Sequence, residues 1–258
     1  MAKAKKREKK SAPPPEQASG GQSGAAVKRS FARATRDLSQ MLRGADAIYR
    51  MPWFALIGGP GTDKSELLID CGLTARPGSP NTFGLEPPGA NNWWFFNDAV
   101  VIDFADAHFG GVADGPAAGR AAKRGFFSRL FRRGGGSSGS TGWKAALEAL
   151  RENRRKRPLD GLVLCVDARK LTAKTPDEKT LLVRRAEAIA ERIFDVQQNL
   201  GVLVPIYVVL THCEGIQGFS VYGKALPEPM RDQMFGWSSP HEPDTGYQHE
   251  WVDEAVGS

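Results

Sequence analysis

The sequence of 258 residues lacks any apolar run near the roughly 20 residues that a membrane-spanning helix needs. Its first residues lack the apolar core of a secretory signal, so no cleaved leader is expected. Cysteine is scarce, and Cys71, Cys165 and Cys213 are odd in number and lie near apolar residues. We therefore expect free thiols in a reducing cytosol and no disulfide framework.

Most of the chain also lacks an excess of charge of either sign, although the net charge is +6. Residues 1–30 hold eight basic and two acidic residues, which leaves 27 of each sign in the remainder. The pI near 9.3 is thus a property of the N-terminal stretch. It does not indicate a nucleic-acid-binding domain, and nucleic acid is an unlikely partner.

Residues 1–27 have too few apolar side chains to bury a core, and we predict a disordered basic tail. The simplest interpretation is a solvated segment. An alternative is attraction to an anionic membrane surface, worth about 1 kcal/mol for each Lys near the lipid. Nucleic acid is a weaker alternative because the tail has no aromatic side chains for base stacking.

A glycine-rich turn follows an apolar run in the sequence WFALIGGPGTDKS, residues 53–65. This is the outline of a P-loop, in which backbone N–H groups surround phosphates, a lysine reaches the outer phosphates and a hydroxyl holds Mg²⁺. Asp63 stands where the pattern requires its second glycine, so we predict an altered phosphate site. Its candidate nucleotide-binding residues are Gly58, Gly59, Pro60, Gly61, Thr62, Asp63, Lys64 and Ser65.

Strand and helix patterns alternate along residues 48–240, which predicts an α/β domain: a P-loop NTPase-like, small-GTPase-like, mostly parallel sheet with helices on both faces. An amphipathic helix over 28–47 precedes this domain, and a polar segment over 241–258 follows it. The expected strands are 53–57, 93–96, 99–104, 161–166 and 204–210, with the second and third forming a hairpin. The expected helices are 65–71, 143–155, 176–200 and an interrupted helix over 219–234.

Low-complexity sequence interrupts the domain over residues 105–142, and its GGGSSGSTG stretch reads as a flexible linker. Within it, residues 123–133 place Phe126, Phe127, Leu130 and Phe131 on one helical face among basic residues. This favours a basic amphipathic helix for a membrane surface or a partner groove, with a mobile loop as the equal alternative. A second basic cluster, Arg154 to Arg157, is expected to be solvated at a helix C-terminus.

Two further stretches correspond to the other nucleotide sites of a GTPase. Asp103 ends a predicted strand, where it could orient Mg²⁺ together with Ser65, but Asp106 replaces the glycine of D-x-x-G. After the last strand, Thr211, His212 and Glu214 stand where a GTPase has its guanine-binding [NT]-K-x-D pattern. Glutamate and histidine differ in length from the Asp and Lys of that pattern, so selectivity for guanine is not expected.

Two of these three departures place a carboxylate where phosphate would lie. Two unit charges 4 Å apart interact by roughly 4 kcal/mol at an effective dielectric of about 20. Half of that would cost on the order of 30-fold in affinity. We therefore favour a structural use of Lys64 in an ion pair with Asp63, Asp103 or Asp106. Bound Mg-ATP or Mg-GTP, with Mg²⁺ on Ser65 and Asp103, is the alternative.

Other catalytic or metal-binding arrangements are weaker. His241, Glu242, Asp244 and His249 show no recognisable ligand spacing and lie in a polar segment, so a metal site there is disfavoured. Cys213 follows His212, but neighbours on a loop after a strand rarely act as nucleophile and base.

Several stretches resemble the cytoplasmic region of the TssM/IcmF family of inner-membrane proteins of bacterial type VI secretion. They are YRMPWFALIGGPGTDKS, NNWWFFNDAVVIDFADAHFG, RKRPLDGLVLCVDARKL and LGVLVPIYVVLTHCEGIQGF. Together they cover roughly residues 40–240. The family landmarks are the Pro-Trp before the P-loop strand, the Trp-Trp-Phe before the Asp103 strand and the Arg-Pro-x-x-Gly before the next strand.

The resemblance implies a GTPase-like domain on the cytoplasmic side of the inner membrane, in a complex with TssL and TssJ and in contact with the baseplate. From the departures at Asp63, Asp106, His212 and Glu214 we predict a degenerate P-loop with a structural or docking role. The alternatives are an active Mg-dependent NTPase that powers conformational change, and a membrane-surface adaptor. We also expect the chain to be a fragment or a shortened relative of a longer membrane protein.

Overall fold

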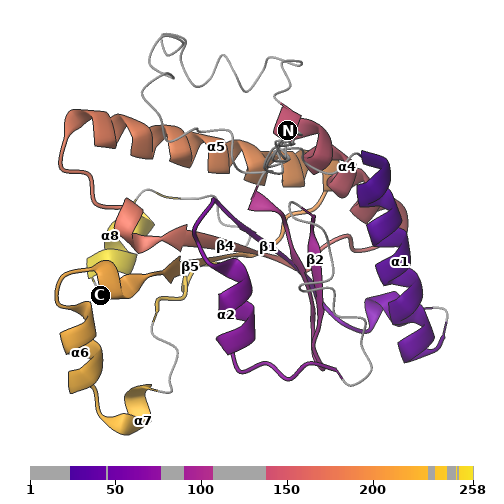
Figure 1. Ribbon diagram of the computed structural model, residues 1–258, viewed down its shortest axis with the longest axis horizontal. Helices are drawn as coiled ribbons and strands as arrows, with labels where there is room; N and C mark the ends of the chain where they lie inside the picture. The colour runs from indigo at the N-terminus through magenta and orange to yellow at the C-terminus, as the bar shows by residue number, and fades with distance from the viewer. Residues whose placement is uncertain are drawn as a thin grey trace, which may run out of the picture.

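The computed structural model describes residues 24–44, 46–76, 90–106, 138–231, 236–242, 248 and 250–257. Five strands form one sheet in the order β2-β3-β1-β4-β5 (Figure 1). Three neighbouring pairs are parallel, and β2 runs antiparallel to β3 as the predicted hairpin. The expected mostly parallel α/β sheet is therefore confirmed. The strands are β1 Trp53–Gly58, β2 Asn92–Phe95, β3 Val100–Asp103, β4 Gly161–Asp167 and β5 Ile206–Thr211.

Helices cover both faces of the sheet (Figure 1). Because side chains alternate along β1, Ala55 and Ile57 join the core under α1, α4 and α5, whereas Leu56 packs with Leu68 of α2 on the other face. The described α-helices are α1 Gly24–Leu42, α2 Lys64–Asp70, α4 Ser138–Asn153, α5 Pro176–Leu200, α6 Phe219–Ala225, α7 Glu228–Arg231 and α8 Glu250–Gly257. Short 3₁₀ helices span Ala47–Tyr49, Ala168–Lys170 and Cys213–Gly215.

Two helix boundaries differ from the sequence-based expectation. The leading helix, expected over 28–47, ends at Leu42 because Arg43 and Gly44 adopt positive φ angles of 46° and 122°. Helix α4 begins at Ser138, inside the stretch expected to be linker. We attribute this to Trp143, which is fully buried and fixes the start of the helix despite the unfavourable glycines. The remaining prediction for the 105–142 insertion lies mostly outside the described residues, as does the tail over 1–23.

The expected solvation of the Arg154 to Arg157 cluster is wrong for its first member. Arg154 is completely buried, and its guanidinium forms a 2.7 Å ion pair with Asp160. It also donates to the backbone carbonyls of Ile48 and Met51, at 3.1 and 3.0 Å. A buried charge persists only when it is paired and hydrogen-bonded, and here it ties α4 to the entry of β1.

Helix α5 has the predicted bounds because its ends are strongly encoded. Thr175 and Glu178 form a reciprocal capping box, and Gly201 closes the helix in the left-handed conformation. The apolar side chains of α5 are only partly covered, since Val196 is buried but Ala186 is exposed. The N-terminal half of α5 therefore leaves apolar surface without a complete cover.

The C-terminal region contains one helix that the sequence did not predict. The expected interruption by Pro227 and Pro229 is confirmed at Pro227, which lies between the short helices α6 and α7, but Pro229 lies within α7. Helix α8 lies in the stretch expected to be a polar segment. Among the helices of the described residues, none has the length and hydropathy required to cross a membrane.

Candidate functional site

The candidate site lies where the parallel strands end. The loop after β1, Asp103 at the end of β3 and the residues after β5 all meet at the carboxyl edge of the sheet, as parallel pairing requires. The structure therefore brings the three sequence-predicted stretches together. The contacts within them show what each residue can bind.

The loop from Gly58 to Asp63 is held tightly by its own side chains. Thr62 is buried, and its hydroxyl donates to the Gly59 carbonyl at 2.9 Å. A Cβ on Gly58 would lie 2.7 Å from the Thr62 hydroxyl oxygen, so this position requires glycine. Gly61 and Asp63 both have left-handed φ angles, 75° and 50°. Asp63 thus keeps the backbone conformation of a glycine while carrying a carboxylate.

Lys64 is buried and is engaged by acids of the same chain. Its ammonium pairs with Asp106 and lies 3.9 Å from Asp103. The Ser65 hydroxyl donates to Asp103 at 2.8 Å. The expected ion pair of Lys64 is confirmed with these two residues, whereas Asp63 is not its partner.

The electrostatics of this pocket are acidic. Burial raises the pKa of Asp103 above its ordinary value, and the nearby Lys64 ammonium opposes that rise. The pocket has a volume of about 310 Å³ and is lined by Asp63, Glu66, Asp103 and Asp106, with Lys64 as its one basic residue among the described lining. An incoming polyphosphate would meet four carboxylates and one ammonium that is already paired.

The residues at the base-recognition position contact the P-loop instead of standing free. His212 has a left-handed φ of 56°, and its Nε2 lies 3.0 Å from the Asp63 carboxylate. Its Nδ1 lies 3.2 Å from Glu214, and the Thr211 hydroxyl donates to the Val166 carbonyl at 3.5 Å. The imidazole therefore lies between two acids, with its Nε2 atom buried.

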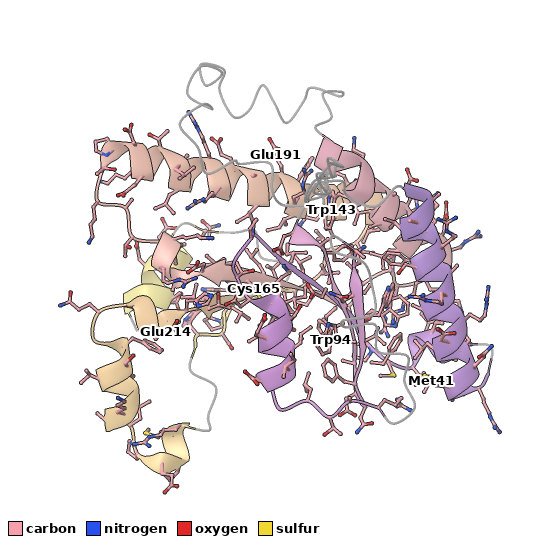
Figure 2. The ribbon with its side chains drawn as sticks, viewed as in Figure 1. Met41, Trp94, Trp143, Cys165, Glu191 and Glu214 are labelled. Carbon is pink, nitrogen blue, oxygen red and sulfur yellow. The ribbon has the colours of Figure 1, made fainter. Side chains whose placement is uncertain are left out.

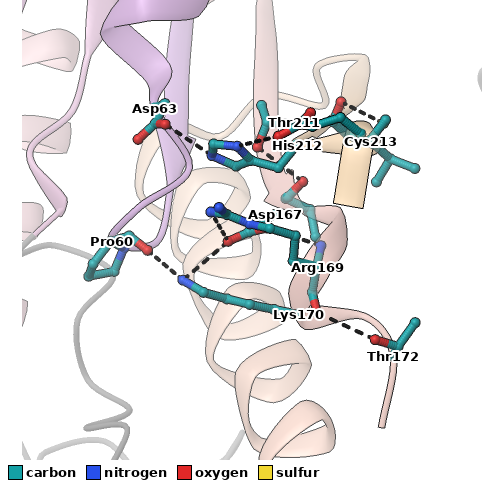
Figure 3. A network of polar contacts seen from close by, with 12 residues as sticks. Pro60, Asp63, Asp167, Arg169, Lys170, Thr172, Thr211, His212 and Cys213 are labelled. Atoms are coloured by element: carbon teal, nitrogen blue, oxygen red, sulfur yellow. Dashed lines mark hydrogen bonds and ion pairs between the residues drawn. The ribbon is translucent and has the colours of Figure 1, made fainter. Parts of the chain in front are cut away.

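Two basic residues after β4, Arg169 and Lys170, also lie at the carboxyl edge of the sheet. Sequence reasoning did not single them out. Asp167 is buried and accepts two hydrogen bonds from the Arg169 guanidinium, at 2.9 and 3.0 Å, and one from the Arg169 backbone N–H at 3.0 Å (Figure 3). These bonds hold the pKa of Asp167 below its ordinary value. Lys170 lies 3.6 Å from Asp167 and donates to the Pro60 carbonyl at 2.7 Å. The signal in the sequence was an acid directly after a strand, followed by two bases.

The weaker candidates gain no support from the described residues. No cluster of three or more potential metal ligands occurs among the residues that the structure describes. His241 stacks on Trp251 with ring centroids 4.2 Å apart and contacts Glu254, while Asp244 and His249 lie outside the described residues. The three cysteines are free, as expected, and burial raises the pKa of Cys165 to about 11.

Comparison with known proteins shows what the chain is similar to. A model of the IcmF-related N-terminal domain matches residues 137–258. The type VI secretion system component TssM1 of Pseudomonas aeruginosa (strain PAO1) is 28% identical over 193 residues. Both matches support the resemblance of the chain to the TssM/IcmF family. The matched residues are 73% of this chain but 15% of TssM1, so the chain spans a small part of that relative.

The TssM/IcmF landmarks of this chain have structural explanations. Trp53, of the Pro-Trp pair, donates its backbone N–H to Asp160 at 2.7 Å, and Asp160 also binds the buried Arg154. Gly161, of the Arg-Pro-x-x-Gly motif, lies under the Phe54 ring, where a Cβ would approach to 2.8 Å. Both landmarks therefore fix the packing of β1 against β4, away from the phosphate edge.

Proposed function

We propose that this chain is a structural and docking domain of a TssM/IcmF-type component of the type VI secretion membrane complex, built on a P-loop frame that its own carboxylates keep free of nucleotide. One observation carries the proposal: the buried ammonium of Lys64 is already paired with Asp106. In a P-loop, this lysine must be available to the outer phosphates. To bind them, Lys64 would have to leave Asp106, and the phosphates would then face that carboxylate.

Asp63 opposes phosphate from the other side of the loop. Its carboxylate extends from the position where backbone and phosphate approach most closely, and the His212 Nε2 atom lies 3.0 Å from it. Like charges about 4 Å apart repel by roughly 4 kcal/mol at an effective dielectric of about 20. The residues present therefore fit a polyphosphate poorly.

A second candidate function is a Mg-dependent NTPase for ATP or GTP. The observation in its favour is the 2.8 Å hydrogen bond between Ser65 and Asp103, the two residues that would hold Mg²⁺. Lys64 would then serve the phosphates, and the bound nucleotide would drive a conformational change. Glu214 and His212, each paired within the protein, give this alternative no evident means of recognising guanine.

The proposed partners and location rest on the similarity to TssM1, a type VI secretion system component. We place this domain at the cytoplasmic side of the bacterial inner membrane, where its surfaces contact other membrane-complex and baseplate proteins. An anionic membrane surface could be contacted through residues 1–27. Co-sedimentation with anionic vesicles, with and without that tail, tests this contact, which is rejected if the lipid charge makes no difference.

Calorimetry with Mg-ATP and Mg-GTP distinguishes the two functions. We expect no micromolar binding by the natural chain. The double variant Asp63→Gly/Asp106→Gly should recover it, because both repelling groups are gone. Asp98→Gly, which removes an exposed acid in the β2–β3 turn, is the matched control and should bind no better than the natural chain. Micromolar binding by the natural chain that is lost in Lys64→Met would overturn the proposal, and a silent double variant would reject the blocking role of the two acids.

A further inference from the structure

The two edges of the sheet are covered to very different extents. At one edge, Trp93, Trp94 and Phe95 of β2 are each at most 5% exposed. Trp94 is buried on the face of the sheet that α2 covers (Figure 2). At the other edge, Tyr207 and Val208 of β5 are 51% and 59% exposed. Strand β5 is therefore the open edge of the sheet in the part of the chain that the structure describes.

The backbone of β5 has hydrogen-bonding groups that β4 does not use. An N–H group of β4 donates to the Pro205 carbonyl at 2.9 Å. Because successive residues of a strand direct their N–H and C=O groups to opposite sides, the odd-numbered residues of β5 face β4 and Ile206, Val208 and Leu210 face away. Apart from the Cys213 thiol, 3.5 Å from the Leu210 carbonyl, no described residue forms a hydrogen bond with these outward groups. Their spacing is the one that another β-strand requires.

The side chains of the same residues form an uncovered apolar row. Tyr207 contacts the ring of Phe54 on the α2 side of the sheet, with ring centroids 6.2 Å apart. The alternation of side chains therefore places Ile206, Val208 and Leu210 on the α5 side. They are 41%, 59% and 46% exposed. A continuous exposed row of large apolar side chains is typical of an interaction site.

Strand β5 also lacks the usual protection of an exposed edge. Soluble proteins prevent edge strands from pairing by means of charged side chains, prolines, bulges or a covering segment. Residues 201–211 contain no charged side chain. Pro205 precedes the strand, and its carbonyl faces β4, so it does not obstruct the outward groups of β5. The register with β4 is unbroken from Ile206 to Thr211. This edge is therefore suited to pairing with a strand.

We propose that β5 pairs with β5 of a second copy of this chain, so that two sheets join across a two-fold axis. The antiparallel register centred on Val208 places Val208 opposite its equivalent and Ile206 opposite Leu210 of the second copy. Hydrogen-bonded pairs recur at every second residue of antiparallel strands. All three outward-facing residues therefore obtain both of their missing hydrogen bonds in this one register.

The side chains favour a second copy as the occupant. On the α5 side, Ile206 and Leu210 meet, and Val208 meets its equivalent. On the other side Tyr207 lies opposite Val209 of the second copy. Aliphatic pairs and aromatic–β-branched pairs stabilise neighbouring strands. Because the strand is uncharged, two copies meet without the repulsion between like charges that an edge rich in lysine would cause. The edge is thus self-complementary, as a symmetric interface requires.

Sedimentation equilibrium of the natural chain tests the pairing. It should show a monomer–dimer equilibrium with a dissociation constant below about 100 μM. Val208→Pro removes an N–H that points away from β4, so the fold is kept while the central hydrogen bonds of the dimer are lost. Val208→Lys places two like charges opposite each other. Both variants should be monomeric where the natural chain is dimeric. Ile69→Lys on α2, where Ile69 is 55% exposed, is the matched control and should dimerise like the natural chain.

Disulfide trapping determines the register. In a Cys71→Ser/Cys213→Ser background, which removes the two natural thiols that are not buried, Val208→Cys should form a cross-linked dimer under mild oxidation. Ile206→Cys and Leu210→Cys should each stay uncross-linked alone and should cross-link when the two variants are mixed. Opposite residues of a hydrogen-bonded pair have Cα atoms about 5.5 Å apart, which is within the range of a disulfide.

Three results would overturn the inference. The first is a natural chain that is still monomeric at about 100 μM, which would leave the edge to a strand of another protein. The second is a dimer that persists in Val208→Lys and in a folded Val208→Pro chain, which would place the interface elsewhere. The third is cross-linking of Ile206→Cys with itself, which would mean a different register. If Val208→Pro does not fold, Val208→Lys and the mixed cross-links decide the question.

Discussion

Lys64 is paired with Asp106 across 42 positions of the chain, and the two acids near its ammonium, Asp103 and Asp106, differ sharply in exposure. The side chain of Asp103 is 5% exposed, whereas that of Asp106 is 45% exposed. The lysine therefore neutralises one acid that water hardly reaches and another that water partly solvates. Its removal should affect Asp103 far more than Asp106.

Lys64→Met should raise the pKa of Asp103 further, because burial already raises it and Lys64 is the main opposing charge. We expect a loss of about 2–3 kcal/mol in unfolding free energy at pH 7, below the full value for a broken buried pair because Asp106 is partly solvated. The folded state then binds a proton at higher pH than the unfolded chain. The loss should therefore shrink as the pH falls through the raised pKa.

Carboxyl titration by NMR and urea unfolding at pH 7 and pH 4.5 measure these effects. Lys170→Met, which removes the same charge at the Asp167 side of the edge, should leave the titration of Asp103 unchanged. A Lys64→Met stability loss of equal size at both pH values would contradict this account.

Asp63→Gly should be more stable than Asp63→Ala by about 1 kcal/mol. Both variants lose the carboxylate and its contact with His212, so that their difference isolates the left-handed backbone, with φ of 50°. Glycine adopts this conformation freely, whereas a Cβ is strained there. Thermal or chemical unfolding of the two variants side by side is sufficient, and equal stability would mean that the loop relaxes out of the left-handed region.

Arg154→Ala should lower the unfolding free energy by about 3 kcal/mol, because it removes the buried cation of Asp160 and leaves two backbone carbonyls without that donor. The loss stays below the upper end for a broken buried pair because the half-exposed Arg157 still pairs with Asp160 at 2.6 Å. The guanidinium also lies 5.0 Å from the centroid of the Trp53 ring, a contact that the variant loses. Arg155→Ala is the matched control, since Arg155 is exposed. Urea unfolding should show less than about 0.5 kcal/mol for the control, and similar losses for both variants would refute the structural role of Arg154.

Gly161→Ala should cost about 1–3 kcal/mol, because its Cβ would overlap the Phe54 ring at 2.8 Å and approach Tyr207 at 3.2 Å. Gly59→Ala is the comparison, since a Cβ there meets no atom within 4 Å. The midpoints of chemical unfolding should separate the two variants. A Gly161→Ala chain as stable as Gly59→Ala would show that the Phe54 ring moves aside without cost.

Much of the fold could be predicted because its signals are local. The bounds of α5 follow from Thr175, Glu178 and Gly201, whose capping interactions span only a few residues. The β2–β3 hairpin and the parallel strands follow from short apolar runs separated by turns or helices. The three stretches of the candidate site could be expected to meet, since parallel strands end at a common edge.

The partners within the site could not be predicted in the same way. Asp63, Asp103 and Asp106 were equal candidates for Lys64, and distances in three dimensions selected the last two. Asp63 instead faces His212, because both residues adopt left-handed conformations on loops that meet only in the folded chain. The burial of Arg154 and the role of Asp167 likewise depend on elements distant in sequence.

The sequence by itself determined the order of the five strands along the chain, the ends of α5 and the presence of carboxylates in a P-loop outline, because these depend on neighbouring residues and backbone preferences. Only the tertiary structure decided that Lys64 forms an ion pair with Asp106, that Arg154 is buried and that apolar side chains of α5 are exposed. Charge pairing and burial depend on distances between segments far apart in the chain, and those distances are set by the packing of the whole domain.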